Sequence, residues 1–424
     1  MKSNNSTKTV LDNGVRIITE SLPVRTVSAG FWVDAGSRDE DSHSNGCAHF
    51  VEHMLFKGTP SRGPEQIARE LDGLGGASNA FTSKESTCLY ATVLDSQLPA
   101  LISIYSDLFL HSEFNRDEVL RERSVILQEL DMVEDTPEDL VHDLFASMIW
   151  AGHPLSNTVL GSRENVSSMT PERLRGFVNG FYSPEKIVIA AAGGLEHDSF
   201  VDLLAEKFST LPQRHPGEIS ADCRSRRTRP ELLAGRREIC SRPFEQAHIV
   251  LGTYGLPADA PERYALLLLN ILLGGNMSSR LFQELREKRG LAYSIGSFTE
   301  SNIDSGHVGI YTGVNPRNAE ESIELIEEIA AGLARGDVLE NDLQRAKGYA
   351  RAGLYLAAEN MDSRMMRLAK NEFIFKRQIS LAEVDSALAR VGVDEVNTLA
   401  VELFAEPMSG FILGPISDHG VVNW

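Results

Sequence analysis

The chain has 424 residues, a formal net charge of −19 at pH 7, a hydrophobic fraction of 42% and a charged fraction of 24%. At roughly 150 residues per domain this length predicts two or three domains, and the ordinary composition excludes intrinsic disorder as the dominant state. The acidic charge excludes nucleic acid as a favoured partner, because the phosphate backbone would repel the protein.

No run of about 18 uncharged apolar residues is present, so we expect no membrane-spanning helix. The polar first residues also lack the apolar core of a secretory signal. The four cysteines show no C-x-x-C spacing and are expected to be reduced thiols. Together these features predict a cytoplasmic protein.

The first part of the chain alternates strand and helix signals. Asn13-Gly14 separates two short apolar runs, which is typical of a β-hairpin. Apolar residues at helical spacing, or alternating and β-branched residues, predict the elements that follow. These are a strand at 27–33, helices at 46–57 and 64–74, strands at 79–82 and 88–94, and a long helix at 117–133.

Residues 213–231 are interpreted as an exposed linker between a domain at 1–212 and a domain at 232–424. A basic cluster can also be a nuclear address or an anion-binding patch, but a solvated linker is favoured in so acidic a chain. The segment and its border hold three prolines and five arginines: Pro212, Pro216, Pro230, Arg214, Arg224, Arg226, Arg227 and Arg229.

The two halves of the chain resemble each other in the order of their elements. Gly36, Gly58 and Thr82 have counterparts roughly 217 residues later, which suggests a duplicated unit. Hairpin signals precede helices in both halves. The sequence therefore predicts an α+β fold of two similar domains related by internal duplication, each with an antiparallel sheet packed by helices.

The segment from His49 to His53 is the strongest chemical signal in the sequence. On a helix, His49 and His53 lie one turn apart on the same face. Two imidazoles so placed suit a zinc ion, which takes nitrogen ligands at about 2.0–2.1 Å. Glu52 borders this face and can accept a proton from water whose pKa the metal lowers from about 15.7 toward about 7. The pattern also arises by chance on surface helices.

A catalytic zinc site needs a third protein ligand and one open position. Glu122 and Glu129 lie two turns apart on one face of the long helix expected at 117–133. They interrupt an apolar stretch, where a carboxylate is costly to bury unless it is paired or binds metal. Either glutamate can be the third ligand, with the other orienting a ligand from behind.

Several motifs together resemble the pitrilysin/insulinase family of zinc metallopeptidases, and within it the short-chain processing peptidase-like members. The histidine segment is the inverted form of a commoner zinc motif. The resemblance covers nearly the whole chain through these segments: Gly46–Gly58, Ser78–Thr82, Glu122–Glu129, His153–Leu155, Gly161, Phe181–Pro184, Ala190–Gly194, Gly274–Phe282 and Glu359–Met361.

The resemblance implies a role for each matching residue. His49, His53 and Glu129 would bind zinc, one ion per chain. Glu52 would be the general base, and Glu122 would assist catalysis. All five residues are present, whereas relatives without activity typically lack one or more of them. The implied function is zinc-dependent hydrolysis of peptides or extended segments by an endopeptidase.

The resemblance also implies contacts with substrate and with a second chain. A peptide substrate would add as a strand near Asn79, Ala80 and Phe81. Arg286 and Tyr293 resemble a pair that holds substrate or stabilises an oxyanion; the alternative is a surface arginine and an ordinary strand tyrosine. A homodimer, or a heterodimer with a related chain, is expected, and in it this pair would come from the partner subunit.

The second half carries no equivalent metal motif. The helix expected at 265–274 has leucines where the base and the second histidine would be. Two other functions stay open: a non-catalytic scaffold or partner-activating subunit of the same fold, and zinc-dependent peptide capture without cleavage. The intact Glu52 and Glu129 favour the enzyme over both.

Overall fold

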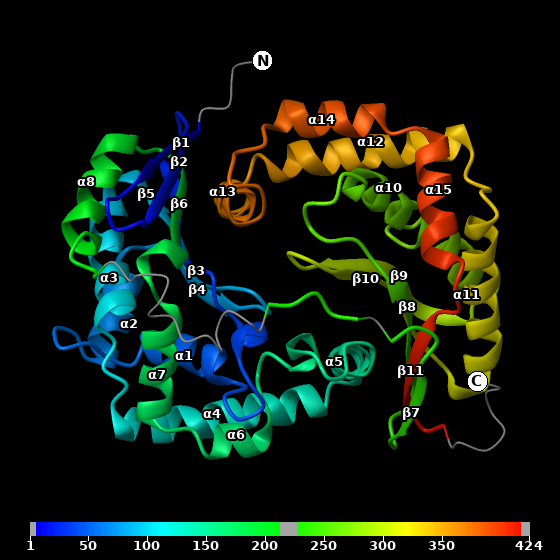
Figure 1. Ribbon diagram of the computed structural model, residues 1–424, viewed down its shortest axis with the longest axis horizontal. Coiled ribbons are helices and arrows are strands. Elements are labelled where there is room, and N and C mark those ends of the chain that lie inside the picture. The colour runs from blue at the N-terminus through cyan, green and yellow to red at the C-terminus, as the bar shows by residue number, and fades with distance from the viewer. Residues whose placement is uncertain (1–5, 213–226, 232, 417–424) are drawn as a thin grey trace. The chain divides into compact units, whose positions relative to one another are not determined.

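A computed structural model describes residues 6–212, 227–231 and 233–416 (Figure 1). Contacts divide the described residues into two units, and neither unit is continuous in the sequence. Unit 1 comprises those of 1–130, 157–228 and 356–380, and unit 2 comprises those of 131–156, 229–355 and 381–424. Most of the linker predicted at 213–231 lies outside the described residues, as does Cys223.

Unit 1 is built on a six-stranded sheet with the order β1-β2-β6-β3-β5-β4. Adjacent strands are antiparallel except β2 and β6, which are parallel. The hairpin predicted at Asn13-Gly14 is confirmed, and Gly14 has the positive φ of 102° that its turn requires. The strands are β1 (Ser6–Val10), β2 (Arg16–Ser21), β3 (Thr26–Val33), β4 (Ala77–Thr82), β5 (Thr87–Leu94) and β6 (Ile187–Gly193).

Two apolar cores lie on the two faces of this sheet. Side chains alternate between faces along a strand, so Phe31 joins the larger core with most helices of the unit, whereas Trp32 packs with Met365 and Leu368 of α13. Burial on both faces explains the nearly unbroken apolar run of β3. The helices are α1 (Cys47–Leu55), α2 (Pro64–Gly73), α3 (Leu98–His111), α4 (Arg116–Glu134), α6 (Arg163–Ser167), α7 (Pro171–Phe181), α8 (His197–Phe208) and α13 (Met361–Phe375).

Unit 2 repeats this topology with a five-stranded sheet of order β7-β11-β8-β10-β9. Its first pair is parallel and the others are antiparallel, as in the series β2-β6-β3-β5-β4 of unit 1. The predicted α+β duplication is therefore confirmed. The strands are β7 (Arg237–Ser241), β8 (Ala247–Tyr254), β9 (Ala292–Ser301), β10 (Gly306–Val314) and β11 (Ser409–Gly414); the helices are α5 (Pro137–Ile149), α10 (Arg263–Leu273), α11 (Ala319–Ala334), α12 (Glu340–Ala357), α14 (Leu381–Arg390) and α15 (Val393–Phe404).

One helix in each unit comes from the half of the chain that builds the other sheet. Helix α5 packs on β8 and β11 of unit 2, where Phe145 lies with Val250 and Phe411 in one core. Helix α13 packs on β2, β3 and β6 of unit 1; it is the orange helix beside the blue and green strands in Figure 1. Each sheet thus has its second face covered by a helix from a distant stretch of sequence.

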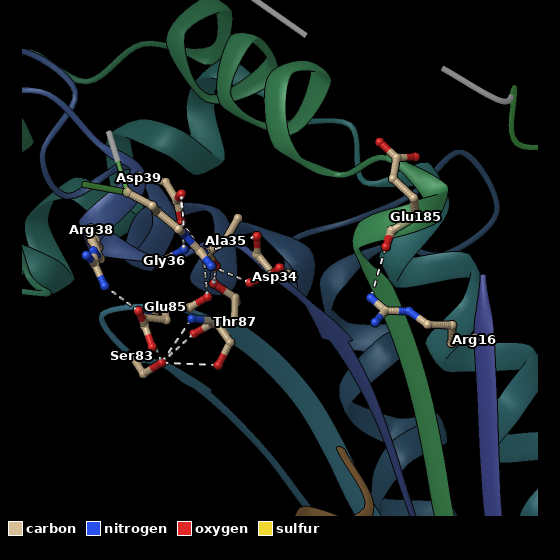
Figure 2. A network of polar contacts seen from close by, with 12 residues as sticks. Arg16, Asp34, Ala35, Gly36, Arg38, Asp39, Ser83, Glu85, Thr87 and Glu185 are labelled. Carbon is tan, nitrogen blue, oxygen red and sulfur yellow. Dashed lines mark hydrogen bonds and ion pairs between the residues drawn. The ribbon is translucent and has the colours of Figure 1, made fainter. Parts of the chain in front are cut away.

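One arginine at the described end of the linker differs from the solvated segment that its composition predicts, whereas Thr228, Arg229 and Glu231 are exposed. Arg227 forms ion pairs of 2.7 Å with both Asp34 and Asp39. The Arg227 side chain is 22% exposed and that of Asp39 is 1% exposed. The prediction of an exposed arginine is wrong at this position because two carboxylates of unit 1 bind it; Figure 2 shows the network around Asp34 and Asp39.

Within the described ranges, every helix is too short or too polar to span a lipid bilayer.

Candidate active site

Helix α1 places the histidine motif on its polar side. Apolar residues of the helix, including Phe50, Val51 and Met54, are buried in the main core of unit 1. His49, Glu52 and His53 follow the opposite stripe and are only partly buried. The helical spacing of the buried residues therefore fixes which side chains can converge on a ligand.

The N-terminus of α1 is held by a buried carboxylate. Glu40 accepts hydrogen bonds from the backbone N–H groups of Gly46 at 2.9 Å and Ala48 at 2.6 Å, and from the Asn45 amide at 2.9 Å. Gly46 precedes the helix with φ of 98°, a conformation that favours glycine. This cap fixes the start of the helix directly before His49.

His49, His53 and Glu129 form a compact set of metal-binding atoms. Their ligand atoms all lie within 4.8 Å of one another. Glu129 Oε2 is 3.7 Å from His49 Nε2 and 3.5 Å from His53 Nε2. A tetrahedral zinc ion with ligands at about 2.0–2.2 Å separates them by about 3.3–3.6 Å. The two nitrogens and the carboxylate oxygen therefore fit zinc in both chemistry and spacing.

The environment shifts the pKa values of the two histidines in opposite directions. Burial, together with the neighbouring His53, lowers the pKa of His49 to about 3, so the ring is neutral at pH 7 as a metal ligand must be. Although burial opposes it, the nearby carboxylates of Glu122, Glu129 and Glu52 raise the pKa of His53.

Glu122 lies behind the candidate ligands. Its Oε2 is 3.1 Å from Nδ1 of His53, and its Oε1 is 2.7 Å from the ammonium group of Lys57. Burial raises the pKa of Glu122, but contacts with His53 and Lys57 outweigh it and lower the pKa overall. Between the two alternatives left by the sequence, the structure thus brings Glu129 into the cluster and Glu122 behind it.

Glu52 projects from the same helix and contacts strand β4. Its Oε2 accepts a hydrogen bond of 2.5 Å from the hydroxyl of Thr82. Burial raises the pKa of Glu52, while the bond from Thr82 acts in the opposite direction. The carboxylate is therefore partly withdrawn from water.

The residues expected to bind substrate fall into two groups. Asn79, Ala80 and Phe81 lie on β4, which is at one edge of the sheet in unit 1. Arg286 and Tyr293 belong to unit 2, where the guanidinium carbon of Arg286 lies 5.0 Å from the centre of the Tyr293 ring. Tyr293 is 79% exposed on β9, so its hydroxyl is available to a ligand.

Helix α10 occupies the place of α1 in the second half and has no ligands. Leu266, Leu268 and Leu269 are buried in the main core of unit 2. Across the described residues, the group of His49, His53 and Glu129 is the single cluster of metal-binding side chains.

Residues 16–163 match the family model described as "Insulinase (Peptidase family M16)", and residues 168–349 match "Peptidase M16 inactive domain". An "uncharacterized zinc protease" of Streptomyces coelicolor is 38% identical over 97% of this chain and 90% of its own length. The chain belongs to peptidase family M16. The resemblance to the insulinase family is thereby confirmed. An "uncharacterized zinc protease" of Bacillus subtilis is also 38% identical to this M16 chain, over 95% of this chain and 97% of the length of that protein.

Solved structures share the fold of this M16 chain. A protease from Helicobacter pylori superposes with a TM-score of 0.90, 20% identity, and coverage of 97% of this chain and 100% of that chain. A "peptidase M16 inactive domain" from Pseudomonas fluorescens gives a TM-score of 0.88 with 20% identity, covering 97% and 99%. The two-unit architecture is thus an M16 architecture.

The sequence analysis assigned no role to three residues that the structure places at the site of the M16 chain. Lys57 pairs with Glu122, Thr82 donates to Glu52, and Glu40 caps α1. Lys57 could have been found, because it lies one helical turn beyond His53. Thr82 contacts Glu52 from another element, and Glu40 contacts α1 from the loop before it. No local sequence pattern predicts either contact.

Proposed function

We propose that this chain is a zinc-dependent endopeptidase that hydrolyses peptides or extended protein segments. The observation that carries the proposal is that the ligand atoms of His49, His53 and Glu129 lie within 4.8 Å of one another. The two histidines come from α1, which also presents Glu52, and Glu129 comes from α4. Membership of the M16 family, and relatives named zinc proteases at 38% identity, support this assignment.

His49, His53 and Glu129 would hold one zinc ion. When bound, the ion would supply Lewis-acid polarisation to a water molecule and to the scissile carbonyl group. Glu122 would accept a hydrogen bond from Nδ1–H of His53, which would leave the lone pair of Nε2 free to bind the ion. Lys57 balances the charge of Glu122 and fixes its second oxygen.

Glu52 would act as the general base and then as the general acid. Its carboxylate would accept a proton from the attacking water and pass it to the amine that leaves when the peptide bond breaks. The burial that raises its pKa brings proton affinity closer to the range useful at neutral pH.

The main chain of β4 would pair with the peptide. In the described part of the sheet, β4 has a neighbour only on the side of β5, so its other edge is available for an added strand. Such pairing reads backbone rather than side chains and so tolerates diverse sequences. Arg286 and Tyr293 are proposed to hold the substrate or stabilise the oxyanion. Pairing of two chains stays a prediction.

The substitution Glu52→Gln separates this function from its alternatives. We expect the variant to lose cleavage of a peptide library while its zinc content stays near one per chain, as in the wild type. Glu65→Gln, at an exposed glutamate of α2, is the matched control and should cleave normally. A wild-type protein that binds zinc but cleaves nothing would indicate peptide capture, and one that binds no zinc would indicate a scaffold.

A further inference from the structure

The contact between Thr82 and Glu52 joins the two functional elements of unit 1. Glu52 comes from α1, and Thr82 is the last residue of β4, the strand on which a peptide would dock. We propose that Thr82 is a positioning residue that holds the Glu52 carboxylate in its working orientation. This inference rests on the proposed function.

The carboxylate needs such a partner. A glutamate side chain loses rotamer entropy when it is fixed, so a partner must hold it in one orientation. Among the described residues, Thr82 is the one hydrogen-bond donor to Glu52. The 2.5 Å separation between the Thr82 hydroxyl and Oε2 of Glu52 is that of a short O–H···O hydrogen bond.

Strand geometry directs the Thr82 side chain toward α1. Alternate residues of a strand share a face, and Ala80, two positions earlier, packs against the main core that contains α1. Phe81 instead packs into the opposite core with α13. Ala80 and Thr82 thus face the base while Asn79 and Phe81 face away.

The hairpin that carries Thr82 is firmly held. Thr82 pairs with Thr87 of β5, and the Thr87 hydroxyl donates to the carbonyl group of Ala35 at 3.1 Å. The turn between them is bound by backbone N–H groups of a neighbouring segment: Ser37 to Ser83 at 3.2 Å, and Arg38 to Lys84 at 2.8 Å. The backbone that carries the Thr82 hydroxyl is therefore held in place.

Charged groups reinforce the same turn. The fully buried Arg38 pairs with Glu85 at 2.6 Å, and Figure 2 shows both side chains beside Ser83 and Thr87. The segment approaches so closely at Gly36 that an added Cβ would lie 2.3 Å from the Ser83 carbonyl oxygen. These contacts hold the end of β4, and with it the Thr82 hydroxyl, in place beside Glu52.

Two substitutions test the role of the hydroxyl. Thr82→Val keeps the shape and removes the donor, whereas Thr82→Ser keeps the donor. We expect Thr82→Val to lower kcat about 10- to 100-fold, with KM within about twofold of the wild-type value and zinc affinity unchanged. Thr82→Ser should recover most of kcat. Thr7→Val, at an exposed strand position, controls for the effect of replacing a threonine with valine away from the site.

A second measurement needs neither zinc nor turnover. In the metal-free protein, the midpoints of thermal unfolding of Thr82→Val, Glu52→Ala and the double variant form a mutant cycle. We expect the double variant to shift the midpoint by less than the sum of the two single shifts. Additive shifts would show that the two side chains do not interact, which would contradict the proposal.

The outcomes separate the two proposals. If the wild type cleaves peptides and Thr82→Val cleaves equally well, or if Thr82→Ser is as impaired as Thr82→Val, the positioning role is wrong and the proposed function stands. If the wild type cleaves no peptide, the proposed function fails, and the positioning role falls with it even where the unfolding cycle detects the hydrogen bond.

Discussion

Loss of Glu122 should weaken zinc binding without removing a ligand. Glu122 supports His53 from 3.1 Å, whereas Nδ1 of His49 is buried without a hydrogen-bond partner among the described residues. The orientation of the cluster therefore depends on this one carboxylate. Loss of such a partner costs about 10- to 100-fold in metal affinity, or about 1.4–2.7 kcal/mol.

The two substitutions at this position should differ in size. Glu122→Gln keeps an acceptor for His53 but loses the charge that Lys57 balances, so we expect a decrease near 10-fold. Glu122→Ala loses both contacts, and we expect a decrease near 100-fold. Competition titration of the metal-free protein against a chromophoric zinc chelator measures both values.

Glu118→Gln is the matched control, because Glu118 pairs with Arg121 on the same helix. It should bind zinc like the wild type, and circular dichroism should show the same helix content for all variants. Wild-type affinity in Glu122→Ala, or an equal loss in Glu118→Gln, would refute the assigned role of Glu122.

Three further predictions follow from the same unit. Removal of zinc with a chelator should abolish cleavage and lower the free energy of unfolding by about 4 kcal/mol relative to a free zinc concentration 1,000-fold above Kd; restored cleavage after zinc is added back distinguishes this from denaturation. Arg227→Met should cost about 3 kcal/mol in urea unfolding, because it leaves Asp34 and Asp39 without this cation; an unchanged midpoint would contradict it. Although burial opposes it, hydrogen bonds from Ser61, Thr59 and Arg62 lower the pKa of Asp107, so stability should fall as pH drops below the unfolded value of about 3.9, and Asp107→Asn should flatten that part of the curve.

The sequence predicts those features that depend on local spacing. The hairpin at Asn13-Gly14 follows from turn chemistry, and the buried face of α1 follows from helical periodicity. The duplication follows from the repeated order of elements, and the resemblance to the M16 family follows from combined motifs. The clustering of His49 and His53 with Glu129 also follows from these motifs, while zinc binding by the three residues stays a prediction.

Other features depend on contacts that periodicity does not encode. The apolar faces of α5 and α13 indicate that each helix is buried, but they do not indicate against which sheet. The packing of each helix on the sheet built by the other half of the chain therefore cannot be predicted from the sequence. Arg227 lies in a segment whose composition indicates solvent exposure, yet Asp34 and Asp39 reach it from distant positions. Thr82 contacts Glu52 across the interface between a strand and a helix.

The exchange of α5 and α13 constrains how such a chain can have arisen. A protein half as long, with one sheet and this helix beyond it, would leave an apolar sheet face open to water. Two such copies could bury those faces by each lending the helix to its neighbour, which is domain swapping between identical subunits. Joining the two genes end to end would make that association permanent. The shared architecture then allows the two copies to differ at one helix, where α10 has Leu268 and Leu269 and α1 has Glu52 and His53.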